Sequence, residues 1–139
     1  MTGANPSPVG RTKDAGWQIG VSRTVAAPAA KVWELLASER GQAIWLGAGA
    51  SLSTTAGEPY ETADGTVGEV RSFRPLDRMR LTWRPTGWDH ETIVQVAIRG
   101  DGDKTMIRFH QDHLANADER ERQRAHWASV IDRVTAELT

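Results

Sequence analysis

The sequence contains no cysteine, and this absence excludes disulfide bonds, thiolate nucleophiles and thiolate metal ligands. It has no basic excess either: the formal net charge is −1, whereas a general nucleic-acid-binding protein usually carries surplus Lys and Arg to displace counterions. No run approaches the ~20 apolar residues of a membrane-spanning helix, and residues 1–16 lack the apolar core of a signal peptide. We therefore expect a cytoplasmic protein that binds neither nucleic acid nor membrane.

Sequence motifs of common enzymes and metal sites are also missing. No Ser stands in a G-x-S-x-G context, and no H-E-x-x-H occurs. The stretch 100–105, GDGDKT, lacks the spacing of a phosphate-binding loop and the distal Glu of a calcium loop, so it predicts a hairpin turn. The sequence thus assigns no catalytic residue, and we expect no metal or other cofactor.

The length of 139 residues is that of a single domain. Residues 1–15 hold Pro, Gly, Ser and Asn with few apolar groups, which predicts a flexible N-terminal tail. Residues 16–139 carry the periodic apolar pattern of a folded unit and are predicted to form the one ligand-binding domain.

The order of the predicted elements indicates the fold class. Alternation, turn signals and helical periodicity predict a strand, two short helices, a run of antiparallel hairpins and a long final helix. The predicted bounds are 17–25 for the first strand, 28–37 and 39–45 for the short helices, 66–74, 78–84, 91–99 and 105–113 for the clearest later strands, and 117–138 for the last helix. With weaker strand signals at 52–62, the order is β-α-α-β6-α. Strands and helices segregated in this way belong to the α+β class.

The final helix is predicted to organise the fold. Asn116 is a good N-cap, with Glu119 three residues further on. One apolar stripe at helical spacing is formed by Trp127, Ile131, Val134 and Leu138. Burying this stripe would contribute on the order of 6–10 kcal/mol before conformational entropy is subtracted. We therefore expect a curved antiparallel sheet wrapped around this helix, with room for a cavity between them.

Tryptophan is abundant for a small chain, with six Trp against two Phe and one Tyr. Trp83 and Trp88 lie beside a Pro/Gly turn in the stretch LTWRPTGWDH. Such rings either line a pocket for an apolar or aromatic ligand or fill the core, which is the commoner role of a single Trp. The sequence leaves both alternatives open.

Several local motifs occur in a characteristic order between about Ile19 and Leu138. They are Ala27-Pro28 before Val32-Trp33, Trp45 at the end of the second short helix, Gly68-Glu69-Val70, Leu81-Thr82-Trp83 with Trp88, and the charged run 118–122 before His126-Trp127. In this order they resemble the START-like (SRPBCC) superfamily, and within it the activator of heat-shock protein 90 ATPase homologue family. The resemblance implies a helix-grip fold, and stand-alone bacterial members look like small-ligand binders. Nothing upstream of Trp17 resembles the additional N-terminal domain that drives chaperone activation in the eukaryotic members.

Together these observations predict a small domain that encloses a hydrophobic or aromatic molecule between the final helix and the sheet. The residues expected to bind this ligand are Trp45, Tyr60, Glu69, Trp83, Gln95, Phe109, Trp127 and Ile131. The aromatic and aliphatic members would line the cavity, and Tyr60, Glu69 or Gln95 would orient a polar group of the ligand. Homodimer formation is left open.

Two other functions fit the same resemblance. A cyclase-, aromatase- or hydrolase-like enzyme would need a titratable group in the cavity, for which Glu61 and Glu69 are the candidates. A module that activates heat-shock protein 90 would need a large exposed apolar or charged patch, with the chaperone as its partner.

Two polar groupings are better explained by solvated sheet faces. His110 and Asp112 share a strand face with the spacing of metal ligands, but no third ligand follows at a suitable position. A local basic cluster, which either meets an anionic partner or faces water, is formed by Arg71, Arg74, Arg78, Arg80 and Arg84. We expect the side chains of both groupings to face solvent.

Overall fold

The computed structural model describes residues 11–12 and 16–139. Its elements in chain order are β1 (Arg11–Thr12), β2 (Gly16–Val25), α1 (Ala29–Ala37), α2 (Glu39–Trp45), β3 (Pro59–Glu61), β4 (Val67–Arg74), β5 (Arg78–Trp83), β6 (Thr92–Asp101), β7 (Lys104–Leu114) and α3 (Ala117–Leu138). The predicted flexible tail, residues 1–15, falls mostly outside the described residues. Its one described part, β1, pairs antiparallel with the start of β2.

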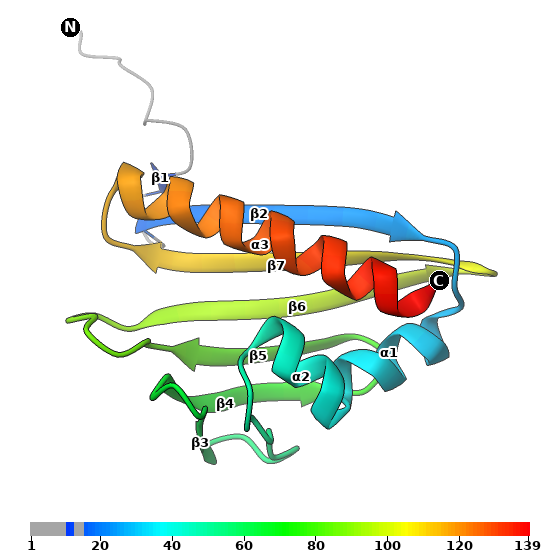
Figure 1. The fold of residues 1–139 in the computed structure, drawn as a ribbon, viewed down its shortest axis with the longest axis horizontal. Coiled ribbons are helices and arrows are strands. Elements are labelled where there is room, and N and C mark those ends of the chain that lie inside the picture. The colour runs from blue at the N-terminus through cyan, green and yellow to red at the C-terminus, as the bar shows by residue number, and fades with distance from the viewer. Residues whose placement is uncertain (1–10, 13–15) are drawn as a thin grey trace, which may run out of the picture.

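The strands of the described residues form one antiparallel sheet of seven strands in the order β1-β2-β7-β6-β5-β4-β3. Strands β3 to β7 follow one another as neighbours, whereas β2, from the beginning of the chain, pairs with β7 near its end. Figure 1 shows the three helices on one face of this sheet, with α3 running obliquely over β2 and β7 and with α1 and α2 in front of the other half. We call the covered face the inner face.

The core lies between the inner face and the helices. Strand alternation turns Val94, Val96 and Phe109 inward, and none of the three has exposed surface. The predicted stripe of α3 is buried against them, with Trp127, Ile131 and Val134 at 0% and Leu138 at 8% exposure. The expected contact between one helical stripe and a sheet face is therefore confirmed.

The structure also confirms the α+β helix-grip class and most element bounds. Both short helices and the long helix begin and end within one residue of the predicted positions. Residues 46–139 are all described, and five strands follow α2 in this part of the chain, one fewer than the predicted six. The weak segment 52–62 yields only the three-residue strand β3, because its turn-forming residues interrupt the strand pattern.

An irregularity in β7 brings two side chains to the core. Trp17 pairs with Leu114 and Ile19 with Gln111, so β7 has one residue more than β2 over this stretch. The backbone of His113 takes up the extra residue with a φ of 67°. As a result Gln111 and Leu114, three residues apart, both face inward.

The start of α3 is capped as predicted. The Asn116 side-chain oxygen accepts a hydrogen bond from the Glu119 backbone N–H at 2.8 Å. The Glu119 carboxylate in turn accepts from the Ala115 backbone N–H at 3.0 Å, which fixes this carboxylate beside the first turn. Among the described helices, α1 and α2 are too short to cross a bilayer, and α3 is too rich in charge.

Replacing Ile131 by Ala should lower the free energy of unfolding by about 2–5 kcal/mol, because a fully buried side chain leaves the helix–sheet contact. Urea unfolding followed by circular dichroism measures this loss. Ser129→Ala, exposed on the same helix, is the matched control and should change the free energy by less than about 0.5 kcal/mol. Equal effects of the two substitutions would contradict the anchoring role of α3.

Candidate functional site

Four of the eight predicted ligand-binding residues meet in the core beneath α3. Trp45, Phe109, Trp127 and Ile131 are each at most 1% exposed. The rings of Phe109 and Trp127 are stacked with centroids 5.1 Å apart, and the Trp45 ring lies 6.3 Å from Phe109. These side chains fill the space between helix and sheet with one another, so a ligand at this depth would have to displace them. Their role in ligand binding stays a prediction.

Two more predicted residues lie on the inner face, on the strands beyond β6. Trp83 is 8% and Tyr60 is 6% exposed. The Tyr60 hydroxyl donates a hydrogen bond to the Thr82 carbonyl oxygen at 2.5 Å. Burial, with a smaller contribution from the Glu91 charge, raises the pKa of Tyr60 far above its ordinary value, so the phenol stays protonated.

The remaining two predicted residues are not brought to the core. Gln95 faces the opposite side of the sheet, where its side-chain oxygen accepts a hydrogen bond from Arg80 at 3.3 Å. Glu69 forms an ion pair with Arg71 at 3.3 Å and has a 41% exposed side chain. Glu61, the other carboxylate considered for acid–base chemistry, is exposed. None of these three side chains contributes a polar group to the space beneath α3.

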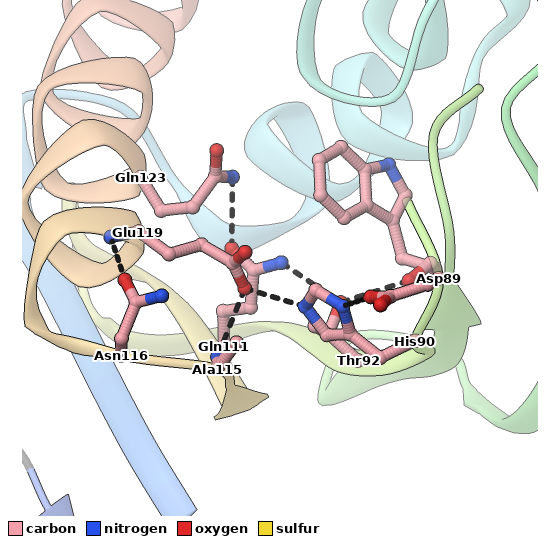
Figure 2. A network of polar contacts seen from close by, with 9 residues as sticks. Asp89, His90, Thr92, Gln111, Ala115, Asn116, Glu119 and Gln123 are labelled. Atoms are coloured by element: carbon pink, nitrogen blue, oxygen red, sulfur yellow. Dashed lines mark hydrogen bonds and ion pairs between the residues drawn. The ribbon is translucent and has the colours of Figure 1, made fainter. Parts of the chain in front are cut away.

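A buried polar network joins β6, β7 and α3, and its central residue was not singled out from the sequence (Figure 2). Gln111 has no exposed surface, and its Oε1 accepts a hydrogen bond from Gln123 Nε2 at 3.0 Å, drawn in Figure 2. The same oxygen accepts from Trp127 Nε1 at 2.9 Å. Its Nε2 donates to Thr92 Oγ1 at 2.9 Å, and that hydroxyl donates to the Trp83 carbonyl oxygen at 2.9 Å. A polar group this deep in an apolar core is tolerated because both ends of the amide are bonded.

Aromatic rings gather beside this network and reach the surface. Trp83 and Trp88 meet edge to face with centroids 5.3 Å apart, and Trp88 stacks on His90 at 4.9 Å. On the α3 side, His126 lies 6.4 Å from Trp83 and 4.8 Å from Trp127. Trp88 and His90 are half-buried, and His126 is exposed. We call this group of five rings the aromatic end of the core.

The loop that carries Trp88 is tied to α3 by a charged pair. The Glu119 carboxylate, 8% exposed, lies 2.6 Å from Nε2 of His90, and Asp89 lies 2.8 Å from Nδ1 of the same ring. Burial by itself lowers the pKa of His90, but hydrogen bonds and charges of Asp89 and Glu119 outweigh burial and raise it. In the protonated form both ring nitrogens donate, as the dashed lines in Figure 2 trace, and the loop is joined to the first turn of α3.

Four surface hollows lie away from the aromatic end. One of about 780 Å³ lies between α2 and the end of α3 and is lined in part by Ile44, Ala48 and Ala136. Hollows of about 560, 450 and 470 Å³ lie between β2 and the start of α3, beside α1, and at the β6–β7 hairpin. The linings of these four hollows, drawn from the described residues, include none of the five rings.

The histidine–carboxylate pair expected on β7 is present on the outer face of the sheet. His110 Nδ1 lies 3.3 Å from Asp112 Oδ1. Burial lowers the pKa of His110; the charge of Asp112 opposes this shift, and the charges of Arg108 and Arg80 add to it. No group of three or more His, Asp or Glu within the described ranges could hold a metal ion.

The sequence contains a signal for Gln111 but none for the His90–Glu119 contact. Ile107, Phe109 and Gln111 occupy alternate positions of one strand, so a period of two places a polar residue on an apolar face. A buried polar residue of this kind needs partners, and its position alone could have marked it. His90 and Glu119 lie 29 residues apart and meet only because α3 docks beside the loop.

The stabilising contribution of His90 should depend on pH. Because its pKa is raised in the folded state, the contribution is complete below the unfolded value of about 6.5 and is lost as the pH rises through the folded-state pKa. The difference in urea midpoint between the parent and His90→Gln should therefore be larger at about pH 5.5 than at about pH 8.5. Glu119→Gln should reduce this difference without removing it, because Asp89 still raises the pKa of His90, and Glu58→Gln, at an exposed position, should leave it unchanged. A pH-independent difference would contradict the pair.

Comparison with known proteins gives matches at the level of a family and of solved structures. A family model described as "Activator of Hsp90 ATPase homolog 1-like protein" matches residues 26–139. No match is found among curated proteins. DynU16, from the dynemicin biosynthetic locus, has a TM-score of 0.73 and 25% identity over 87% of this chain, which spans 46% of that protein. The chain thus covers about half of DynU16.

Two further structures share the fold at lower identity. CalU16 from Micromonospora echinospora has a TM-score of 0.73 at 17% identity, covering 91% of this chain and 87% of that one. An HSP90 activator from Plasmodium falciparum has a TM-score of 0.74 at 12% identity, covering 88% and 96%. These likenesses confirm the START-like helix-grip fold, and the family model extends over most of the chain. The chain belongs to the activator of Hsp90 ATPase homolog 1-like family.

Proposed function

We propose that this chain is a small-molecule-binding domain that holds an apolar or aromatic ligand at the aromatic end, between α3 and the inner face of the sheet. Its family and fold support a small binding domain or a cyclase-like role. The observation that carries the proposal is the convergence of five rings and the Gln111 network at one place that reaches the surface. Ligand sites commonly combine apolar walls with a few fixed polar groups.

The walls suit a flat aromatic ligand. Trp83 presents its ring between Trp88 on the loop and His126 on α3. A planar molecule that takes the place of the half-buried Trp88 ring would keep an edge-to-face contact with Trp83. Aromatic pairs of this kind contribute about 0.5–1.5 kcal/mol beyond the area they bury.

The network offers a polar anchor for such a ligand. Gln123 is 8% exposed and is the member of the network that lies near the start of α3. A ligand hydroxyl could donate to Gln111 Oε1 in place of the Gln123 amide, which would leave no buried acceptor unpaired. The proposed ligand is therefore planar, mainly apolar and carries a single hydroxyl group.

Access to the site requires the loop between β5 and β6 to open. Gly87 in this loop has a φ of 89°, and residues 84–91 hold no regular strand or helix. Its contacts to α3 run through His90 and Glu119, while the sheet pairing of β5 with β6 ends at Trp83 and Thr92. Loop opening therefore leaves the sheet intact, and binding should be easier at a pH where His90 is neutral.

The test measures dissociation constants by isothermal titration calorimetry. The reference compound is 2-naphthol, and neutral planar phenols of three and four rings follow. Trp83→Phe should weaken binding about fivefold or more, since the larger ring wall is lost. Trp33→Phe is the matched control: Trp33 is equally exposed at 8% and also meets an aromatic partner edge to face, Phe73 at 5.7 Å. Equal weakening by both substitutions, or no binding of any phenol to the parent, would refute the proposed site.

Acid–base chemistry in the same site is a second candidate, favoured by one observation. Glu119, with an 8% exposed side chain, is a titratable group directly beside the aromatic end, and it contacts His90, a titratable ring of that group. A hydrolase-like activity predicts turnover of a 4-nitrophenyl ester above the buffer rate, reduced about 10²-fold in Glu119→Gln. A hydrolysis rate with the protein equal to the rate in buffer alone would contradict the enzymatic candidate and leave ligand binding as the proposed function. Only the family match supports activation of a chaperone, and we do not propose this function.

A further inference from the structure

The outer face of the sheet carries two adjacent rows of basic side chains. Strand pairing aligns Arg74 of β4, Arg78 of β5 and Arg108 of β7 in one row across the sheet, with Ala97 of β6 between Arg78 and Arg108. The neighbouring row runs from Arg80 through Gln95 and His110 to Gly20 on β2. The four arginines of these rows, Arg74, Arg78, Arg80 and Arg108, are called the arginine rows. All helices lie on the other face (Figure 1), so no helix of the described chain covers them.

The arginine rows are not neutralised by the protein itself. None of the four forms an ion pair with a carboxylate of the described residues. Nearby, Asp112 faces His110 at 3.3 Å, and Glu69 faces Arg71 at 3.3 Å. The positive charge is therefore concentrated on one sheet face of a chain whose formal net charge is only −1.

Two buried polar atoms in the rows have no hydrogen-bond partner among the described residues. They are Nε of Arg78 and the Ser72 hydroxyl, which sits next to Arg80 in the second row. Arg80 itself has one hydrogen bond in the described chain, to Gln95 at 3.3 Å. These two atoms are buried and do not themselves face a partner, so it is the uncompensated positive charge of the rows that suits an acceptor-rich partner.

Gly20 keeps space for one of these arginines. A Cβ atom at Gly20 would lie 2.9 Å from a terminal nitrogen of Arg108 and 3.2 Å from its Nε. The guanidinium group therefore extends over the β2 backbone, and any larger residue at position 20 would push it away. This contact places a β7 side chain over β2 and widens the basic face beyond β4, β5 and β7, the strands that carry the four arginines.

The chemistry of the surface favours a protein segment over a nucleic acid. Single-stranded nucleic acids are held by aromatic stacking, and the two rows contain no Trp, Tyr or Phe. Guanidinium groups pair with carboxylates through two parallel hydrogen bonds. Successive outward positions on a strand are about 6.6–6.8 Å apart, which equals the spacing of alternate side chains in an extended peptide.

We propose that the arginine rows bind an extended acidic protein segment whose Glu or Asp side chains alternate with other residues. Carboxylates at alternate positions of the segment meet the two rows in turn, and Gln95, within the second row, supplies a neutral hydrogen-bonding group beside Arg80. This surface lies on the opposite side of the sheet from the proposed ligand site, so the two bind independently.

The test uses a fluorescein-labelled peptide of about ten residues in which Glu and Ser alternate, with binding followed by anisotropy at about 50 mM salt. The triple variant R78Q/R80Q/R108Q should weaken binding about tenfold or more, since three charge-assisted contacts are lost. The control R122Q/R124Q/R133Q removes the same charge from exposed positions on α3 and should change affinity less than about twofold. Raising the salt to about 300 mM should weaken binding to the parent and to the control variant alike.

Three outcomes would overturn the proposal: no binding of the peptide to the parent, equal weakening by both triple variants, or tighter binding of an oligothymidylate of the same length. The last result would assign the surface to nucleic acid. If circular dichroism shows that R78Q/R80Q/R108Q does not fold, the variant R74Q/R108Q at two exposed positions decides, with a loss of about threefold or more expected. Binding of 2-naphthol should be unchanged in all arginine variants, so failure of this proposal and failure of the ligand site are separate results.

Discussion

The contact between Trp127 of α3 and the inner face of the sheet is the interaction on which the rest of the structure depends. Its ring stacks on Phe109 at 5.1 Å, and its Nε1 donates to Gln111 at 2.9 Å, so one side chain combines apolar burial with a specific hydrogen bond. Apolar burial holds the helix against the sheet without fixing its position along the strands. The hydrogen bond supplies that position, because a shift of α3 would leave the buried amide unpaired.

The position of α3 then decides what lies around it. Its first turn comes beside the β5–β6 loop, where Glu119 meets His90 and where the half-buried Trp88 packs on Trp83. Its last turns lie beside α2, where Arg40 and Glu137 form an ion pair. The middle of the grip is filled by Trp45, Phe109 and Trp127, each at most 1% exposed. A ligand at the centre of the helix would therefore have to displace these three rings, and this is why we propose the ligand site at the end of α3 beside the β5–β6 loop.

The two faces of the sheet follow opposite chemistry, although they belong to the same strands. Met79 and Val96 face the core, whereas their neighbours Arg78, Arg80 and Gln95 face outward. Alternation along each strand guarantees this separation. It allows one small domain to carry an apolar core on one face of the sheet and a charged surface on the other, with no shared side chain between them. The arginines considered in the sequence as a solvated cluster thus acquire Arg108 as a neighbour from a distant strand.

The sequence by itself determined the element order, the α+β class, the cap at Asn116 and the buried stripe of α3. These features depend on local periodicity and on residues within a few positions of one another. It also predicted Trp45, Trp83 and Trp127 as ligand-binding residues, which stays a prediction. It grouped Gln95 and Glu69 with them, but strand alternation turns Gln95 to the other face and Glu69 pairs with Arg71. Only the tertiary structure joined His90 to Glu119, centred the network on Gln111 and aligned the arginines of β4, β5 and β7 in two rows. Those contacts connect residues far apart in the chain, and their partners are chosen by strand register and helix docking, which no local pattern encodes.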